Sequence, residues 1–313
     1  MLNMIKMDVY RMFRTKSMYV IWIILLASAL ITSFLSKIDY DAANKEWEKQ
    51  QAVESQADTD TDMQAADVVN AQDIEQQQAA DSNKEQLSQQ NTDNVNIGMS
   101  VELPTEPGKK VTVMDVFFSN AQGKFYALFL VIFAVMFATA DIKSGYIKNI
   151  GGQVSQRGML IVSRAVALAL FTAITFSGIF VFQAANMLAF KCVVWGNWKE
   201  IIPYFLTELM LHYAFVLICM AIAVIIKNNV ISMTLSVCLT MNIMSIVYAL
   251  IDYVGNRVGL HNFNIYKYTV TGRMAMLPMN AGRDDVISSM CVAATFIVIM
   301  LSLSSYIFQK RDI

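Results

Sequence analysis

The chain of 313 residues is 56% hydrophobic and only 16% charged, and its mean hydropathy is +0.44. A soluble domain of ordinary composition is about 45–50% apolar and about 25% charged, so both departures point toward a lipid environment. This composition excludes a disordered, collagen-like or disulfide-scaffold chain, and it disfavours a soluble enzyme.

Charge is unevenly distributed along the chain. Residues 37–123 hold 17 acidic and 6 basic side chains, a net charge of −11, whereas the rest of the chain carries +10. A segment of one sign beside a body of the opposite sign indicates two environments, which a membrane would separate.

The chain begins with a basic amphipathic segment. In residues 1–17, apolar residues recur at helical spacing on one face, and the lysines and arginines lie mostly off that face. This pattern predicts an interfacial helix along the inner membrane surface; an ordinary basic flank that sets topology is the alternative. The apolar run 18–36 predicts the first crossing. A cleaved signal peptide is disfavoured, because no A-x-A-like site follows Ser36.

About 20 apolar residues are needed to cross about 30 Å of hydrocarbon. Further apolar stretches bring the total to six, so we expect an all-α polytopic membrane protein. The remaining five crossings are predicted at 124–141, 159–182, 203–226, 230–251 and 286–308. The second crossing is short, and it reaches span length only if Lys124 and Asp141 extend their charges outward from its ends.

Basic residues near helix ends set the orientation of a membrane protein. They cluster before the first crossing, between the second and third, between the fourth and fifth, and after the sixth. We therefore predict a multi-pass protein of a bacterial plasma membrane with both termini cytoplasmic, the tail 309–313 included. The 37–123 segment is then extracellular. The external loop 252–285 is an exception to the rule, since it carries basic residues as well as aspartates.

The external segment is rich in Gln, Asp, Asn, Ser and Thr. Low hydrophobicity with net negative charge is typical of an acidic insert that is partly disordered or helical; a defined binding domain is the alternative. None of the four cysteines lies in 37–123, so no disulfide framework is expected there. The sequence has no CxxC pair or Cys/His cluster, and we predict no metal site.

The loop 142–158 is polar, basic and broken by glycines, and it is longer than two antiparallel helices require. A loop of this size on the cytoplasmic side could dock another protein. The sequence contains no G-x-x-x-x-G-K-[ST], so we expect no ATP hydrolysis by a P-loop on this chain.

Several features occur together in one order: a basic interfacial helix, a first crossing, an external insert, and a second crossing that ends in an acidic residue. Local motifs follow, at Gly145-x-Ile147-Lys148-Asn149, Ser155-x-Arg157 and Ser163-Arg164. In these respects the chain resembles the membrane subunits of ATP-binding-cassette exporters of the ABC-2 type. It is most similar in style to the small permeases of antimicrobial-peptide or antibiotic export and immunity. The resemblance covers nearly the whole chain except most of 40–110.

The resemblance implies that the inner loop is a coupling helix, which touches a separately encoded P-loop ATPase that binds ATP and Mg. The implied contact residues are Asp141, Lys143, Gly145, Ile147, Lys148, Asn149 and Arg157. It also implies pairing with itself or with a homologous permease, and external helices within 252–285 that partly re-enter the membrane. We expect no catalytic residue and no cofactor on this chain, and no nucleic-acid partner.

Polar residues inside predicted helices are candidates for a substrate path, because an ionisable group at mid-bilayer costs about 2.5–3.5 kcal/mol. Glu208 and His212 share one helix face. They could form a proton relay or cation contact, or a local hydrogen bond near the outer interface. Gln183, Asn186 and Asn242 could face the same path, or could hydrogen-bond between helices at about 1 kcal/mol each.

The predicted function is that of a permease subunit of an ATP-driven transporter. It would export, or extract from the membrane, an amphipathic substrate such as an antimicrobial peptide, a drug or a lipid. One alternative is a membrane-anchored sensor or scaffold that uses the acidic insert. The other, an intramembrane hydrolase, is disfavoured because the chain has no G-x-S-x-G and only 2 histidines.

Overall fold

The computed structural model describes residues 2–63, 111–143, 158–190, 198–241, 243–257 and 264–310. Every regular element in these ranges is a helix, which confirms the predicted all-α fold. The elements are α1 (Leu2–Arg14), α2 (Lys16–Met63), α4 (Val113–Gln122), α5 (Phe125–Lys143), α7 (Gly158–Ala189), α8 (Trp198–Ile226), α9 (Asn229–Thr240), α10 (Met244–Arg257), η1 (Ile265–Tyr268), α11 (Val270–Met276) and α12 (Arg283–Gln309).

Four helices in the described ranges are long and apolar enough to cross a membrane by themselves. The crossing segments are Lys16–Leu35, Gly158–Asn186, Ile201–Ile226 and Arg283–Gln309. Two bent pairs, α4 with α5 and α9 with α10, raise the total to six if each pair is one crossing. The chain is therefore a multi-pass helical membrane protein with four to six spans.

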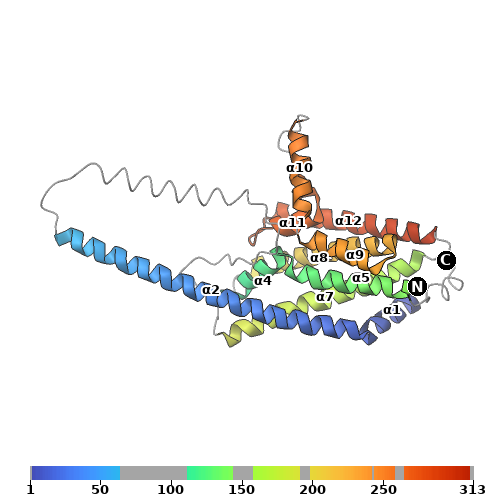
Figure 1. Cartoon of the computed structure of the whole chain (residues 1–313), viewed down its shortest axis with the longest axis horizontal. Helices are drawn as coiled ribbons and strands as arrows, with labels where there is room; N and C mark the ends of the chain where they lie inside the picture. The colour runs from blue at the N-terminus through green and yellow to red at the C-terminus, as the bar shows by residue number, and fades with distance from the viewer. Residues whose placement is uncertain are drawn as a thin grey trace.

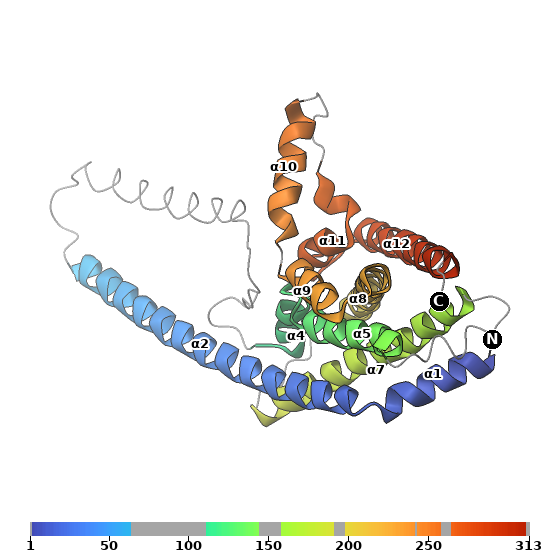
Figure 2. The same ribbon diagram turned by 45° about the vertical axis from the view of Figure 1, so that its right-hand side comes forward.

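Helix α8 lies at the centre of the bundle, with α5, α7, α9 and α12 around it, whereas α2 packs on the outside of α5 and α7 (Figure 2). In an apolar stretch of 18 residues, 61% of the α8 residues are buried, against 28% in α2 and 11% in α12. The outer helices therefore present apolar surface outward, where a bilayer would cover it.

The second crossing differs from its prediction at its N-terminal end. Residues 113–122, assigned from the sequence to the external insert, form α4, and all but the last of them are buried in the bundle. A capping box begins the helix: the Thr112 side chain accepts from the Asp115 amide, and the Asp115 carboxylate accepts from the Thr112 amide. The polar residues of α4 lower its hydropathy, so the sequence did not predict it as part of a crossing. The chain then bends by 53° into α5.

The predicted fifth crossing, 230–251, is broken in the structure. Helix α9 ends at Thr240, and α10 departs at 62° to stand away from the bundle (Figures 1 and 2). Contacts with the following segment hold this direction: the Tyr248 hydroxyl is 2.8 Å from Thr271 Oγ1, and the Tyr266 hydroxyl donates to the Ser245 carbonyl at 3.3 Å. The bend is thus stabilised by residues far along the sequence.

The segment 264–277 returns from α10 to the bundle and packs on α8. Val270, Met274 and Leu277 are buried there. A Cβ on Gly272 would lie 2.3 Å from the Tyr266 carbonyl oxygen, so the fold-back of η1 onto α11 requires glycine at this position. The predicted external segment 252–285 therefore contains short helices that are part of the core.

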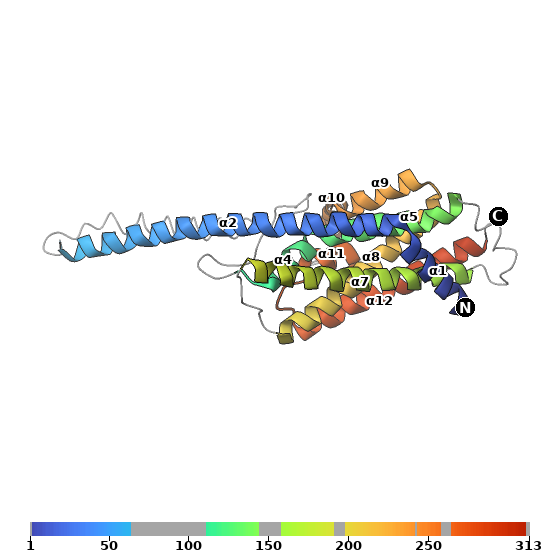
Figure 3. The same ribbon diagram turned by 90° about the horizontal axis from the view of Figure 1, so that it is seen from below.

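Helix α2 continues without interruption from the predicted first crossing into the insert. Its apolar part ends at Leu35, and the helix runs on to Met63 as an arm beyond the bundle (Figures 1 and 3). The arm is about 42 Å long at 1.5 Å per residue. The rest of the insert, 64–110, lies outside the described residues.

Candidate functional site

Most residues of the predicted coupling loop cannot be placed. Gly145, Ile147, Lys148, Asn149 and Arg157 lie outside the described residues, as does Asn242. Asp141 and Lys143 fall in the last turn of α5, where the backbone alone is described. The coupling assignment therefore stays a prediction, while the helices that flank the loop, α5 and α7, are described.

The flanking helices meet α1 at one end of the bundle, which we call the loop end: the C-terminal ends of α5 and α12, the start of α7, and α1 (Figures 1 and 3). Asp8 of α1 is buried, and its carboxylate accepts a short hydrogen bond from the Ser163 hydroxyl of α7. Arg11 lies 3.7 Å from Asp8 and 5.2 Å from the ring centre of Phe137 on α5. Helix α1 is therefore attached to both helices that carry the loop.

Further bonds tie the same end together. A guanidinium nitrogen of Arg164 donates to the Ala138 carbonyl at 3.3 Å, joining α7 to α5. The Thr139 hydroxyl donates to Asn229 Oδ1 at 2.9 Å, joining α5 to α9. Ser305 donates to the Gly158 carbonyl at 3.4 Å, joining α12 to α7. Displacement of the loop would therefore move several helices together.

The predicted pair Glu208 and His212 lies deep in the bundle, with both side chains 0% exposed. His212 Nδ1 is 2.8 Å from the Glu208 carbonyl oxygen and 3.2 Å from the carboxylate Oε2. A carbonyl oxygen can only accept, so Nδ1 carries the proton and donates it. The local hydrogen bond expected from the sequence is present, but the pair is enclosed by protein.

Lys124 supplies a cation to the same site, which the sequence analysis missed. It stands in the turn between α4 and α5 with φ 58°, and its side chain is buried. Its ammonium interacts electrostatically with the Glu208 carboxylate on α8. The expectation that Lys124 extends outward from a helix end is therefore wrong. Because α4 precedes it, Lys124 lies at the bend between two buried helices.

Two tyrosines lie beside these charged groups, and further aromatic rings surround them. We call the five residues the buried polar cluster: Lys124, Tyr126, Tyr204, Glu208 and His212. The Phe117 ring lies 5.7 Å from that of Tyr126 and 6.5 Å from that of Tyr204, and the Phe176 ring lies 4.6 Å from that of His212. Within the described part of the chain, Glu208 Oε1, His212 Nε2 and the Tyr204 hydroxyl have no hydrogen-bond partner. Such an environment strengthens every electrostatic interaction in it.

The other predicted path residues lie elsewhere. Gln183 on α7 is fully buried, and its amide nitrogen lies 3.5 Å from the Ser33 hydroxyl on α2, which favours a helix–helix contact over a substrate contact. Asn186 is also buried, one turn further along α7. The structure therefore unites Glu208 and His212 with Lys124, while Gln183 belongs to the α2–α7 contact.

Across the residues that the structure describes, no group of three or more His, Cys, Asp or Glu side chains is placed to hold a metal ion. Comparison of the sequence with protein-family models, and with curated proteins, finds no match. The chain is therefore a multi-pass helical membrane protein that carries the buried polar cluster.

Proposed function

We propose that this chain is the permease subunit of an ATP-driven transporter, of the kind suggested by its resemblance to ABC-2 exporters. In this proposal a separate P-loop ATPase subunit binds ATP and Mg, and the 142–158 loop contacts it. The permease pairs with itself or with a homologous subunit. Its substrate is amphipathic, such as an antimicrobial peptide, a drug or a lipid, and this chain carries out no covalent chemistry.

The observation that carries the proposal is the construction of the loop end. A loop that receives force from another protein must be attached to helices that move as a unit. Here Asp8, Arg11 and Arg164 connect α1, α5 and α7 at the two points where the loop begins and ends. A push on the loop would thus reach the bundle rather than dissipate in a loose connection.

The buried polar cluster supplies the second part of the argument. It places Lys124, from the turn between α4 and α5, and Glu208, from α8, in one water-excluded interior, where moving charges relative to each other is costly. Elements linked in this way favour discrete arrangements over gradual deformation, and alternating access needs two such arrangements.

Site-specific crosslinking tests the proposed ATPase contact. A cysteine replaces Lys148, and a matched cysteine replaces Lys45 on the exposed arm of α2. After crosslinking in native membranes, we expect Lys148→Cys to capture a protein with a P-loop ATPase sequence and Lys45→Cys to capture none. Failure to recover an ATPase from position 148, or equal recovery from both positions, contradicts the proposal.

A sensor or scaffold is the second candidate, and the arm of α2 favours it. The arm continues a membrane span as one uninterrupted helix, and it exposes Asp41, Glu46 and Glu48. Such an arm could present a binding surface at a distance from the membrane. Deletion of 45–95 separates the two functions: a permease keeps substrate transport, whereas a sensor loses all activity.

A further inference from the structure

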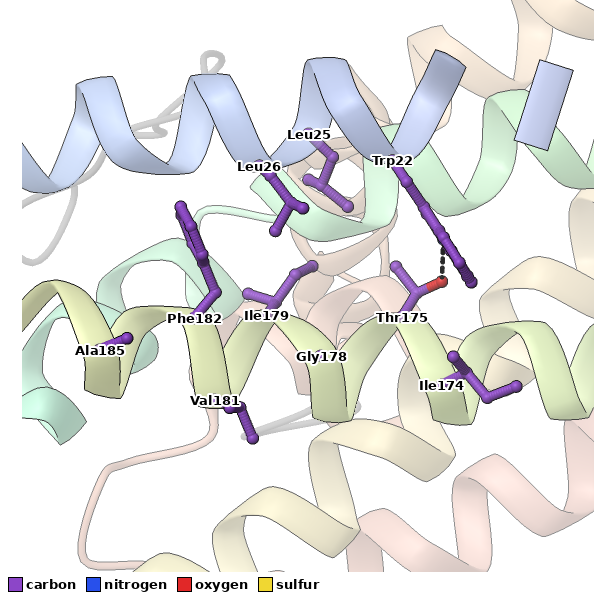
Figure 4. Close-up of a pocket in the computed structure, with 10 residues that line it drawn as sticks. All are labelled: Trp22, Leu25, Leu26, Ile174, Thr175, Gly178, Ile179, Val181, Phe182 and Ala185. Atoms are coloured by element: carbon purple, nitrogen blue, oxygen red, sulfur yellow. Dashed lines mark hydrogen bonds between the residues drawn. The ribbon is translucent and has the colours of Figure 1, made fainter. Parts of the chain in front are cut away.

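A groove of about 370 Å³ lies between α2 and α7 (Figure 4). Its walls are apolar and include Leu26 from α2 and Phe182 from α7. At one end, Trp22 Nε1 donates to Thr175 Oγ1 at 2.9 Å, so the two polar side chains of the lining bind each other. The groove therefore offers apolar contacts to a bound molecule, and none of its lining residues is charged.

The groove opens toward the surface that lipid would cover. Both walls belong to segments able to cross a membrane, Lys16–Leu35 and Gly158–Asn186. Lining residues remain exposed as well, with Val181 at 67% and Ile174 at 41%. Large apolar side chains exposed within a membrane span face hydrocarbon. The molecules that meet this groove are therefore lipid tails.

Gly178, in the middle of the α7 wall, leaves the groove deep. A Cβ at this position would meet no atom within 4 Å. Glycine inside a helix costs about 0.5–1 kcal/mol relative to alanine, and its usual role in membranes is to let two helices approach closely. No such approach exists among the described atoms around Gly178, so its effect is to keep space open.

The size of the groove favours a slender guest. An α-helix with its side chains is about 10–12 Å across, whereas an unbranched acyl chain is only one methylene group wide. A helix from a second copy could cover the groove without filling it, whereas an unbranched acyl chain can enter.

A cation lies further along the same α2–α7 contact. Lys37 lies two residues after the end of the α2 span; its Nζ donates to the Phe190 carbonyl at 3.3 Å and lies 5.2 Å from the Phe190 ring centre. An ammonium has three donors, so it can bind a phosphate oxygen as well. Phe182 is about 12 Å along α7 from Phe190, and one leaflet of hydrocarbon is about 15 Å thick. The spacing suits a lipid whose phosphate is at Lys37 and whose tail reaches the groove.

We propose that the α2–α7 groove binds one acyl chain of a phospholipid, and that Lys37 holds the phosphate of the same molecule. Affinity comes from packing on two walls and from the phosphate contact, since lipid tails are as apolar as the groove and transfer between them yields little. The site is independent of the proposed ATP-driven transport, and a sensor of this fold would have it too.

Native mass spectrometry of the purified full chain in detergent tests the site, with phosphatidylglycerol as the probe. We expect the wild-type chain to retain one lipid that Gly178→Phe does not, with the bound fraction falling about fivefold or more. Gly178→Ala should lower the bound fraction far less than Gly178→Phe, because a single methyl group enters the groove and meets no protein atom. Leu170→Phe, at an exposed position of α7 outside the groove, is the matched control. Lys37→Gln should lower the bound fraction about threefold.

Equal lipid retention by the wild type and Gly178→Phe overturns the proposal. So does a loss of dimer with unchanged lipid binding, which would assign the groove to a second copy. If Gly178→Phe fails to fold, Leu26→Trp fills the groove from α2, and the same reduction is expected. Because the measurement uses neither ATPase nor transport, its result is separate from that of the crosslinking test.

Discussion

Lys124 and Glu208 illustrate how a single side chain can be misread from its neighbours in the sequence. Lys124 borders an apolar stretch and has the position of a flanking charge, yet it is buried in the interior, where the charge of Glu208 on another helix acts on it. Burying such a pair carries a desolvation cost, so its presence does not by itself stabilise the fold. Removing one partner is a different matter, because the other charge then stays in the interior.

We therefore expect Glu208→Ala to destabilise the protein by about 1–3 kcal/mol, since buried polar neighbours, Lys124 among them, lose an opposite charge. The double variant Lys124→Met with Glu208→Leu should recover most of that loss, because both charges are replaced by apolar groups. Denaturant unfolding in mixed micelles measures both effects. Glu46→Ala, at an exposed glutamate of the α2 arm, should change stability by less than about 0.5 kcal/mol. If the double variant lost as much stability as its two single substitutions, Lys124→Met and Glu208→Leu, lose in sum, Lys124 and Glu208 would not be coupled.

Asp8 was not singled out from the sequence, because it lies in a basic helix with apolar neighbours. The structure pairs it with Ser163 on α7. We expect Asp8→Ala to release α1 from the bundle, as the lost bond to a charged group is worth about 1.5–3 kcal/mol. Hydrogen exchange of the α1 amides should quicken, while the exposed Asp41→Ala leaves it unchanged. Unaltered exchange in Asp8→Ala would show that apolar contacts alone hold α1.

Helix α4 shows how packing overrides composition for a whole element. It is short, and it contains Asp115 and Asn120, yet it fills the interior beside α5 and α7. Phe117 contributes to this by contacting rings from three other helices. The capping box satisfies backbone groups at its start that would otherwise be buried without partners.

Loss of that cap should loosen α4 locally. Thr112→Ala removes one side-chain acceptor from the first turn, and we expect a cost of about 1 kcal/mol. Faster hydrogen exchange at the amide of Asp115 is the specific sign, since that amide donates to Thr112 Oγ1. Thr234→Ala, at an exposed site on α9, is the control. A uniform change across the bundle, rather than one centred on α4, would argue against a capping role.

The molecule as a whole has α1 at one end of its bundle and the α2 arm at the other (Figures 1 and 3). If the Lys16–Leu35 segment crosses a bilayer, these two ends lie in different compartments. The excess of basic residues in 1–17 predicts that the α1 end is the cytoplasmic one.

Cysteine labelling tests this orientation in a variant without the four natural cysteines. We expect a membrane-impermeant maleimide to label Glu46→Cys on intact cells, and to label Tyr10→Cys only after permeabilisation. Both positions are exposed on their helices, so access depends on the membrane alone. Labelling of both positions from the same face would refute the crossing by α2 and the topology built on it.

Local patterns were sufficient for the helical membrane fold and for part of the site. Hydropathy over about 20 residues located α2, α7, α8 and α12, because each is a continuous apolar run. The spacing of Glu208 and His212 identified their contact, since residues four apart meet on any helix. The coupling residues came from motifs in a loop, and they stay predictions.

Long-range packing determined the remaining features, and no sequence window contains it. Lys124 and Glu208 are buried in one interior, and Asp8 bonds to Ser163, across large separations along the chain. The inclusion of α4 in the core and the departure of α10 likewise depend on partners far away in the sequence. Hydrophobic length and helical spacing are local properties, whereas burial of a charge depends on which helices become neighbours when the bundle closes.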